Sequence, residues 1–161
     1  MFQPKISIIT ICYNSAQTIE KTIQSIVEQD YTNREYIIVD GLSTDNTLSI
    51  VNKYSKQIDV IISEKDKGIS DAFNKGITRA SGDIIVLINS DDILLPDALS
   101  KVAQAWEPGI DIFSTNVIMK DCDTGYECRE VPSTTFPLMP FCRHVAHQGA
   151  YISSECYNRY G

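Results

Sequence analysis

The chain has 161 residues, about the length of one domain, and its 43% hydrophobic and 22% charged residues are typical of a globular protein. A net charge of −7 argues against a nucleic-acid partner, because such binding rests on clustered Lys and Arg. The apolar runs have about five residues against the roughly 20 of a membrane helix, and no secretion signal is evident, so we expect a cytoplasmic protein.

Strand and helix patterns alternate through residues 1–109. Strands are indicated by short runs rich in β-branched residues, and helices by apolar residues that recur every three or four positions. In chain order the expected elements are a strand at 5–12, a helix at 15–29, a strand at 35–40, a helix at 47–54, a strand at 58–63, a helix at 69–80, a strand from 84 and a helix at 96–106. Four strand–helix repeats predict an α/β fold with a mostly parallel sheet and helices on both faces.

The pattern changes after Pro108. Residues 111–120 and 126–131 flank a turn-rich stretch, which predicts a hairpin rather than a crossover. One more strand is expected at 148–152, and a short helix at 153–160. The second part of the chain therefore adds antiparallel structure to the parallel repeats.

The most informative stretch is IIVLINSDD, in which an apolar strand stops at Asp91 and Asp92. Residues just past the carboxyl end of a parallel strand lie at the crevice where open α/β sheets bind ligands. Two adjacent carboxylates repel each other unless a cation or hydrogen bonds stabilise them, so a divalent metal carrying a phosphorylated ligand would suit them. The alternative is that Ser90, Asp91 and Asp92 cap the next helix.

The first strand–helix junction, CYNSAQT, has no glycine, and neither a dinucleotide fingerprint nor a P-loop is present elsewhere. A nucleotide must then be held by side chains and metal at the strand ends, where Thr10, Tyr13 and Asp40 also lie. A Tyr13 ring suits stacking on a base, and the Asp40 carboxylate suits accepting an N–H from the base edge. The alternatives are that Tyr13 is half-buried core and that Asp40 only starts the turn at Gly41.

A polar stripe lies opposite the apolar face of the helix at 69–80. Its members share helical spacing and are Asp71, Asn74, Lys75 and Thr78. A charged connector, EKDKG, leads into this helix from the end of a strand, so a cation there could meet a diphosphate. The alternative is an ordinary solvated helix face.

Four stretches in order resemble the successive motifs of family 2 glycosyltransferases, which have the GT-A fold. They are SIITICYN, EYIIVDGLSTDNT, DKGISDAFNKGI with ASGD, and LINSDD, and HQG at 147–149 resembles a later family element. The resemblance implies one GT-A domain over 1–161, a three-layer α/β sandwich with a mostly parallel central sheet, truncated at its C-terminus. Residues 1–109 would bind the nucleotide, and 110–161 would begin an incomplete acceptor-side part.

The resemblance also implies an activity, the inverting transfer of a sugar from a UDP- or GDP-sugar to a hydroxyl acceptor. The cofactor would be Mn²⁺ or Mg²⁺, and the pathway would be cell-surface polysaccharide or lipopolysaccharide synthesis. The acceptor would be a carbohydrate or a lipid-linked molecule. Peripheral contact with the inner face of the membrane and a homo-oligomer both stay open.

The resemblance also implies which side chains bind the nucleotide. The set is Thr10 and Tyr13 beside the base, Asp40 at its edge, Asp91 at the ribose, and Asp71, Asn74 and Lys75 along the donor pocket. Asp92 would ligate the metal together with diphosphate oxygens. His147 and Gln148 would lie near the donor phosphates or the acceptor, and the alternative for His147 is a buried, satisfied histidine.

The chain departs from the family where the general base is expected. In the family that acidic motif lies beyond the HQ element, whereas here Glu155 is the last carboxylate before Gly161. We therefore expect the base beyond Gly161, and a chain that binds the donor but transfers sugar weakly or not at all by itself. The alternative is a non-catalytic nucleotide-sugar-binding module. A nucleotidyltransferase is disfavoured because CYNSAQT lacks a glycine- and Arg/Lys-rich loop.

Overall fold

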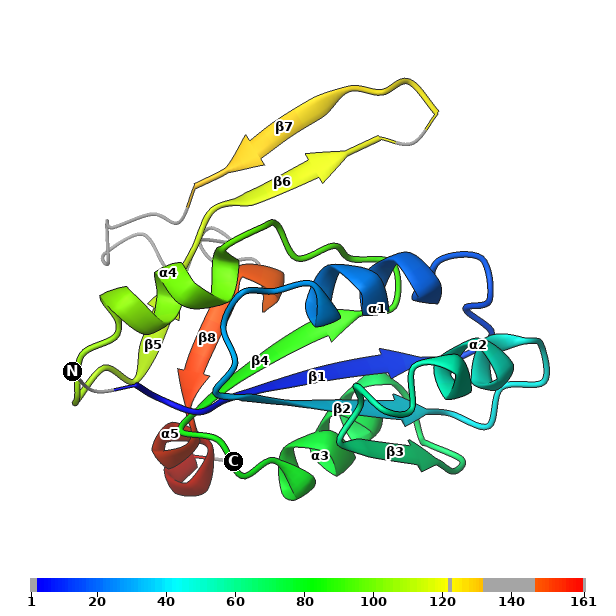
Figure 1. The fold of residues 1–161 in the computed structure, drawn as a ribbon, viewed down its shortest axis with the longest axis horizontal. Helices are drawn as coiled ribbons and strands as arrows, with labels where there is room; N and C mark the ends of the chain where they lie inside the picture. Colours follow the sequence, from blue (N-terminus) through cyan, green and yellow to red (C-terminus); the bar gives the residue numbers. More distant parts are fainter. Residues whose placement is uncertain (1–2, 122, 132–146, 161) are drawn as a thin grey trace.

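A six-stranded sheet forms the centre of the computed structural model, which describes residues 3–121, 123–131 and 147–160 (Figure 1). The strand order is β3-β2-β1-β4-β8-β5. The strands are β1 (Ile6–Cys12), β2 (Arg34–Asp40), β3 (Val60–Ser63), β4 (Ile84–Asn89), β5 (Ile112–Ser114) and β8 (Ala150–Ser153). β1 to β4 run parallel, and β8 is antiparallel to both of its neighbours, so the predicted mostly parallel sheet is confirmed.

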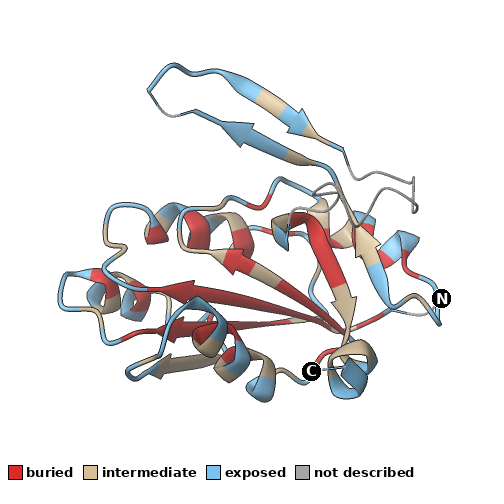
Figure 2. Ribbon diagram, turned by 180° about the vertical axis from the view of Figure 1, so that it is seen from behind, coloured by how far each residue is buried: buried red, intermediate tan, exposed pale blue. Residues whose placement is uncertain are grey.

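Helices cover both faces of the sheet, which confirms the predicted three layers. They are α1 (Ile19–Val27), α2 (Thr47–Lys53) and α4 (Ala98–Ala105) on one face, and α3 (Ile69–Arg79) with α5 (Ser154–Tyr160) on the other. Side chains alternate along β1, so Ile8 packs with α1 residues such as Ile23, whereas Ile9 packs with Phe73 of α3. Burial is densest in β1, β2 and β4, whereas the edge strand β3 is only partly buried (Figure 2).

Two helices begin later than the sequence pattern predicts. α1 begins at Ile19 rather than at 15, and residues 15–18 form a turn in which the Ser15 and Ala16 N–H groups donate to the side chains of Thr47 (2.7 Å) and Asp45 (3.1 Å). α4 begins at Ala98 rather than at 96, because Asp97 has a φ of +61° and cannot continue a right-handed helix. Asp97 also occupies the N-cap of α4, so the alternative that residues 90–92 cap this helix is wrong.

The stretch predicted as one hairpin arm at 111–120 is two strands. β5 joins the central sheet beside β8, and β6 (Val117–Lys120) pairs instead with β7 (Glu127–Glu130). The contact with the segment before β8 extends as far as Thr115, whose N–H donates to the Gly149 carbonyl at 2.8 Å, and β6 begins two residues later. The β6–β7 hairpin projects from the body of the protein (Figure 1).

The C-terminal elements are shifted slightly from their predicted positions. The HQG stretch forms a short 3-10 helix, η2 (His147–Gly149), so β8 begins at Ala150 rather than at 148, and α5 begins at Ser154 rather than at 153. Within the described residues no helix is long and apolar enough to cross a membrane, and the longest, α3, has 11 residues.

Candidate functional site

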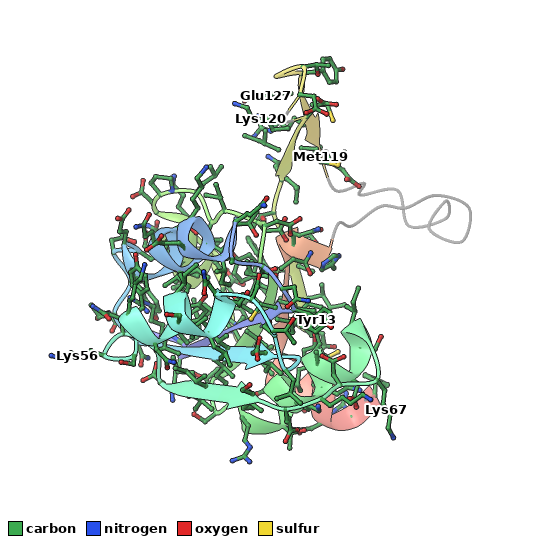
Figure 3. The ribbon with its side chains drawn as sticks, turned by 90° about the vertical axis from the view of Figure 1, so that its right-hand side faces the viewer. Tyr13, Lys56, Lys67, Met119, Lys120 and Glu127 are labelled. Atoms are coloured by element: carbon green, nitrogen blue, oxygen red, sulfur yellow. The ribbon has the colours of Figure 1, made fainter. Side chains whose placement is uncertain are left out.

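The carboxyl ends of β1, β2, β3 and β4 meet at one edge of the sheet, which we call the carboxyl edge. It consists of the loops that follow these strands, residues 13–18, 41–46, 64–68 and 90–97. From β1 the chain proceeds to β2 and β3 on one side, while β4 lies on the other, so β1 and β4 flank a topological switch point. Open α/β sheets bind ligands at such a point. Figure 3 looks onto this edge, with Tyr13 near its centre.

Hydrogen bonds between side chains and neighbouring loops brace the carboxyl edge. The Ser15 and Ser90 hydroxyls are 2.8 Å apart and so link the loops after β1 and β4. The loops after β1 and β2 are joined by Asn14, whose N–H donates to the Ser43 hydroxyl (2.8 Å) and whose side-chain oxygen accepts the Thr44 N–H (2.9 Å). Sequence reasoning missed this bracing, although the density of Asn, Ser and Thr in both loops is its signal.

Tyr13 presents an open aromatic face at the carboxyl edge. Its side chain is 61% exposed, so the half-buried core alternative is wrong. A Cβ atom added to Gly41 would lie 2.5 Å from Asp66 Oδ2 and 3.4 Å from Tyr13 Cδ2, so the ring and this carboxylate border the same backbone. Asp66 in turn accepts the Gly68 N–H at 3.0 Å. An aromatic face beside a carboxylate can bind a planar base, and Asp66 was not among the residues predicted for the site.

Asp40 and Thr10 lie beneath this surface and are fully buried. The Asp40 carboxylate accepts hydrogen bonds from the Ser63 hydroxyl (2.8 Å) and the Ser43 N–H (3.1 Å), so it does start the turn at Gly41, as the alternative held. The Thr10 hydroxyl accepts the Tyr36 O–H at 3.1 Å. Both side chains are therefore satisfied inside the protein, and their predicted contacts with a base stay predictions.

Burial also sets the protonation state of Cys12, the thiol next to Asp40. The pKa of Cys12 rises to about 12, mainly because burial disfavours the thiolate and further because the Asp40 carboxylate is close. The Cys12 Sγ lies 3.8 Å from Asp40 Oδ1 and donates to it. Cys12 is therefore a neutral hydrogen-bond donor that supports Asp40, and not a nucleophile.

The two carboxylates after β4 have different environments. Asp91 is exposed, whereas Asp92 is half-buried and turns back onto Asn89. The Asn89 N–H donates to Asp92 Oδ2 (3.1 Å), and the Asp92 N–H donates to the Asn89 carbonyl (3.2 Å). Burial raises the pKa of Asp92 and the negative charge of Asp91 raises it further, against the effect of the Asn89 N–H. A cation beside Asp92 would stabilise the charged form of this carboxylate and so lower its pKa.

His147 reaches the same place from far along the chain. Its Nε2 lies 3.2 Å from the side-chain Nδ2 of Asn89, and its ring packs edge-on against Phe73 of α3, with centroids 6.4 Å apart. His147 is exposed, so the buried-histidine alternative is wrong, and Gln148 beside it is half-buried. When the His147 ring is protonated, its charge lowers the pKa of Asp92. The fold thus gathers His147, Asn89 and Asp92 at the end of β4.

The polar stripe of α3 contacts the connector that precedes the helix. Asp71 accepts the Lys67 N–H at 3.0 Å, and Lys75 Nζ donates to the Lys65 carbonyl at 2.7 Å. The Lys67 N–H, and then the charge of Lys75, lower the pKa of Asp71. Asn74 is exposed. These contacts hold the connector in place, and a contact of the stripe with a donor stays a prediction.

Comparison with known proteins identifies the family. The sequence model of glycosyl transferase family 2 matches residues 7–144. This chain belongs to that family. It is 38% identical over 103 residues to the putative teichuronic acid biosynthesis glycosyltransferase TuaG of Bacillus subtilis, a match that covers 62% of this chain and 41% of that relative. This family 2 glycosyltransferase chain therefore spans about two fifths of TuaG.

Solved structures confirm the GT-A architecture. TarS of S. aureus, residues 1–349, superimposes with a TM-score of 0.59 at 30% identity and covers 62% of this chain and 31% of its own. Mannosyltransferase PcManGT from Pyrobaculum calidifontis, in complex with GDP-Man and Mn²⁺, superimposes with a TM-score of 0.72 over 100% of this chain and 48% of its own. At 23% identity the second likeness shows the fold alone.

A divalent metal in this family 2 glycosyltransferase would need oxygen ligands at the carboxyl edge. Among the described residues no group of three or more His, Cys, Asp or Glu side chains could together hold a metal ion. The half-buried Asp92 carboxylate next to Asp91 suits a different arrangement, in which Mg²⁺ or Mn²⁺ uses one or two carboxylates and takes its other ligands from phosphates and water. These residues fit a metal that binds together with a diphosphate.

Proposed function

We propose that the carboxyl edge binds a nucleotide-diphosphate sugar, UDP- or GDP-linked, for inverting transfer of the sugar to a hydroxyl acceptor. The observation that carries the proposal is the half-buried Asp92 at the end of β4, flanked by Asp91 and joined through Asn89 to His147. This carboxylate has few hydrogen-bond donors, lies at the topological switch point and belongs to a family 2 glycosyltransferase. Such a group is suited to a cation-bridged phosphate.

The nucleoside would lie across the loops after β1 and β2. The open Tyr13 ring would stack on the base, and Asp66 beside it would face the base edge. Asp40 and Thr10 would support this surface from within, since their side chains are buried and hydrogen-bonded there. The ribose hydroxyls would reach the exposed Asp91, because carboxylates accept hydrogen bonds from hydroxyls.

The diphosphate would lie over the end of β4. Asp92, fixed by the main chain of Asn89, would hold a metal that neutralises the charge growing on the leaving diphosphate. His147 would contribute a hydrogen bond to the same region, because its ring is already held beside Asn89. The sugar carbon would then face an acceptor hydroxyl on the side opposite the leaving group, which gives inversion.

The relatives support the proposed donor class and setting. TarS has been crystallised in complex with UDP-GlcNAc, and PcManGT in complex with GDP-Man and Mn²⁺. TuaG is named for teichuronic acid biosynthesis, and a 32% identical relative from Staphylococcus epidermidis is a poly-beta-1,6-N-acetyl-D-glucosamine synthase. We accordingly propose a role in cell-surface polysaccharide synthesis at the cytoplasmic face of the membrane.

Calorimetric titration with UDP and with GDP, each with and without Mn²⁺, tests the proposal. We expect one nucleotide to bind in a metal-dependent manner, and Asp92→Ala to weaken that binding at least about 100-fold, because it removes a direct metal ligand. Asp30→Ala, which removes an exposed carboxylate after α1, is the matched control and should bind as the wild type does. Equal metal-dependent binding by Asp92→Ala would refute the metal assignment.

A further inference from the structure

Asn89, the last residue of β4, contacts two predicted site residues at once. Its main-chain N–H and C=O both bond to Asp92, at 3.1 and 3.2 Å. Its side-chain Nδ2 lies 3.2 Å from His147 Nε2. Asn89 therefore contacts the carboxylate through its main chain and the imidazole through its side chain.

The other contacts of η2 hold His147 where this amide can reach it. Phe73, which is 8% exposed, meets the imidazole edge-on from α3. Gly149 is fixed by Thr115, whose N–H (2.8 Å) and hydroxyl (3.2 Å) both donate to its carbonyl. A Cβ atom at Gly149 would lie only 2.8 Å from the Thr115 carbonyl oxygen, so β5 and η2 pack closely. The short helix is thus anchored at both ends, and the Asn89 contact is part of a defined geometry.

We propose that Asn89 is a positioning residue that joins His147 to Asp92, so that both are presented to the donor diphosphate in one fixed arrangement. This inference rests on the proposed function, because it assumes that the diphosphate binds at the end of β4. An amide nitrogen only donates, so His147 Nε2 is the acceptor and the neutral imidazole carries its proton on Nδ1. That Nδ1–H is then available as a donor to an anionic ligand.

The imidazole tautomer tests the link directly and needs no ligand. In ¹⁵N NMR spectra at about pH 8.5, two units above the ordinary imidazole pKa of about 6.5, we expect an unprotonated Nε2 on His147 of the wild type. Asn89→Asp has the same shape but offers an acceptor, so Nε2 should become protonated. A His147→Gln variant assigns the signals against those of His144, the only other histidine. A protonated Nε2 in the wild type, or identical spectra for Asn89→Asp, would overturn the proposal.

Binding measurements test what the link does. Asn89→Ala keeps the main-chain bonds to Asp92 and should weaken Mn²⁺-dependent binding of UDP or GDP about 10-fold, in the range found for residues that orient metal ligands. If Asn89 acts through His147, Asn89→Ala combined with His147→Ala should bind no more weakly than the weaker of the two single variants. Asn52→Ala, an exposed asparagine on α2, is the matched control and should have no effect.

The outcomes separate this inference from the proposed function. A wild-type chain that binds neither nucleotide contradicts the proposed function and, with it, the role of Asn89 toward a diphosphate. A wild-type chain that binds while Asn89→Ala binds equally well, or while the losses from Asn89→Ala and His147→Ala multiply, overturns the role of Asn89 alone. Weakened binding with a coupled double variant and the expected tautomer supports both.

Discussion

At the amino-terminal edge of the sheet, the buried Glu35 accepts hydrogen bonds from Lys5 (2.8 Å), from Ser7 and from both the N–H and the hydroxyl of Ser81. At the carboxyl edge, the Asp92 carboxylate accepts one hydrogen bond from the described residues, that of the Asn89 main-chain N–H. Burial by itself would raise the pKa of Glu35, but these donors outweigh burial and lower the pKa to about 2. At Asp92 burial and the neighbouring Asp91 outweigh the donors, and the pKa rises.

The difference separates a carboxylate that stabilises the fold from one that is suited to a ligand. A buried charge whose lone pairs are all occupied holds neighbouring segments together, here the starts of β1 and β2 and the turn before β4. A half-buried carboxylate with too few hydrogen-bond donors is destabilised in its charged form, and a bound cation would stabilise that form. We expect changes at Glu35 to alter stability and changes at Asp92 to alter binding.

The largest effect on stability should come from Gly82→Ala, at the amino-terminal edge of the sheet. A Cβ atom at Gly82 would lie 2.7 Å from the Lys5 carbonyl oxygen and 2.8 Å from the Ser7 nitrogen, which are main-chain atoms of β1 and its approach. Because backbone cannot move aside cheaply, Gly82→Ala should lower the free energy of unfolding by about 3 kcal/mol or more, measured by urea denaturation.

Gly41→Ala is the matched substitution at the carboxyl edge. Its Cβ atom would meet the end of the Asp66 side chain, which can rotate away, so we expect a loss below about 1 kcal/mol. Nucleotide binding should nevertheless weaken, because Asp66 and Tyr13 border this position. Equal losses of stability in the two variants would contradict the contrast between the edges.

Glu35→Gln should have the next largest effect. The difference between a pKa of about 2 and the ordinary value of 4.5 corresponds to about 3 kcal/mol at most, and Gln keeps one acceptor, so we expect a loss of about 2 kcal/mol at pH 7. Because the folded-state pKa is lowered, the contribution of Glu35 is fully present above about pH 4.5 and is lost as the pH falls through about 2.

The stability difference between wild type and Glu35→Gln, followed by thermal unfolding from pH 7 downward, checks this sign. It should narrow below about pH 4.5. Glu107→Gln, which neutralises an exposed carboxylate after α4, serves as the control and should match the wild type at each pH. A difference that widened toward acid pH would show that the hydrogen bonds to Glu35 do not favour its charged form.

Asp92→Asn should produce the smallest change in stability, and one of opposite sign. Because the folded-state pKa of Asp92 is raised, its charged form opposes folding above the ordinary value of 3.8, and the amide removes that penalty. We expect a gain below about 1 kcal/mol at pH 7 that disappears as the pH falls below 3.8, measured by thermal unfolding against Asp30→Asn. A loss of stability at pH 7 would mean that Asp92 holds the fold together as Glu35 does.

Most of the fold could be predicted from the sequence because its elements have clear periodicity. The apolar runs of β1, β2 and β4 and the helical spacing in α3 identify the repeats and their order. Junctions were harder, because they depend on single conformations and distant partners. Nothing local indicates that Asp97 adopts φ of +61° or that Thr47 and Asp45 take the first N–H groups after Asn14.

The candidate site was predictable in part for the same reason. Asp91 and Asp92 follow directly from the strand that precedes them, and Tyr13 from its place after β1. The contact between Asn89 and His147 joins residues 58 positions apart across an antiparallel strand, and no periodic pattern encodes it. The same holds for Asp66, which is placed against Gly41 by the path of a loop.

The β6–β7 hairpin shares no ladder with the six-stranded sheet in the part of the chain that the structure describes, and its side chains Met119, Lys120 and Glu127 lie far from Tyr13 (Figure 3). An ion pair of 3.0 Å between Lys120 and Glu127 links its two strands. Insertions or substitutions in such a hairpin leave the packing of β1 to β4 untouched. A changed length or sequence in this arm would therefore leave the loops that form the carboxyl edge as they are.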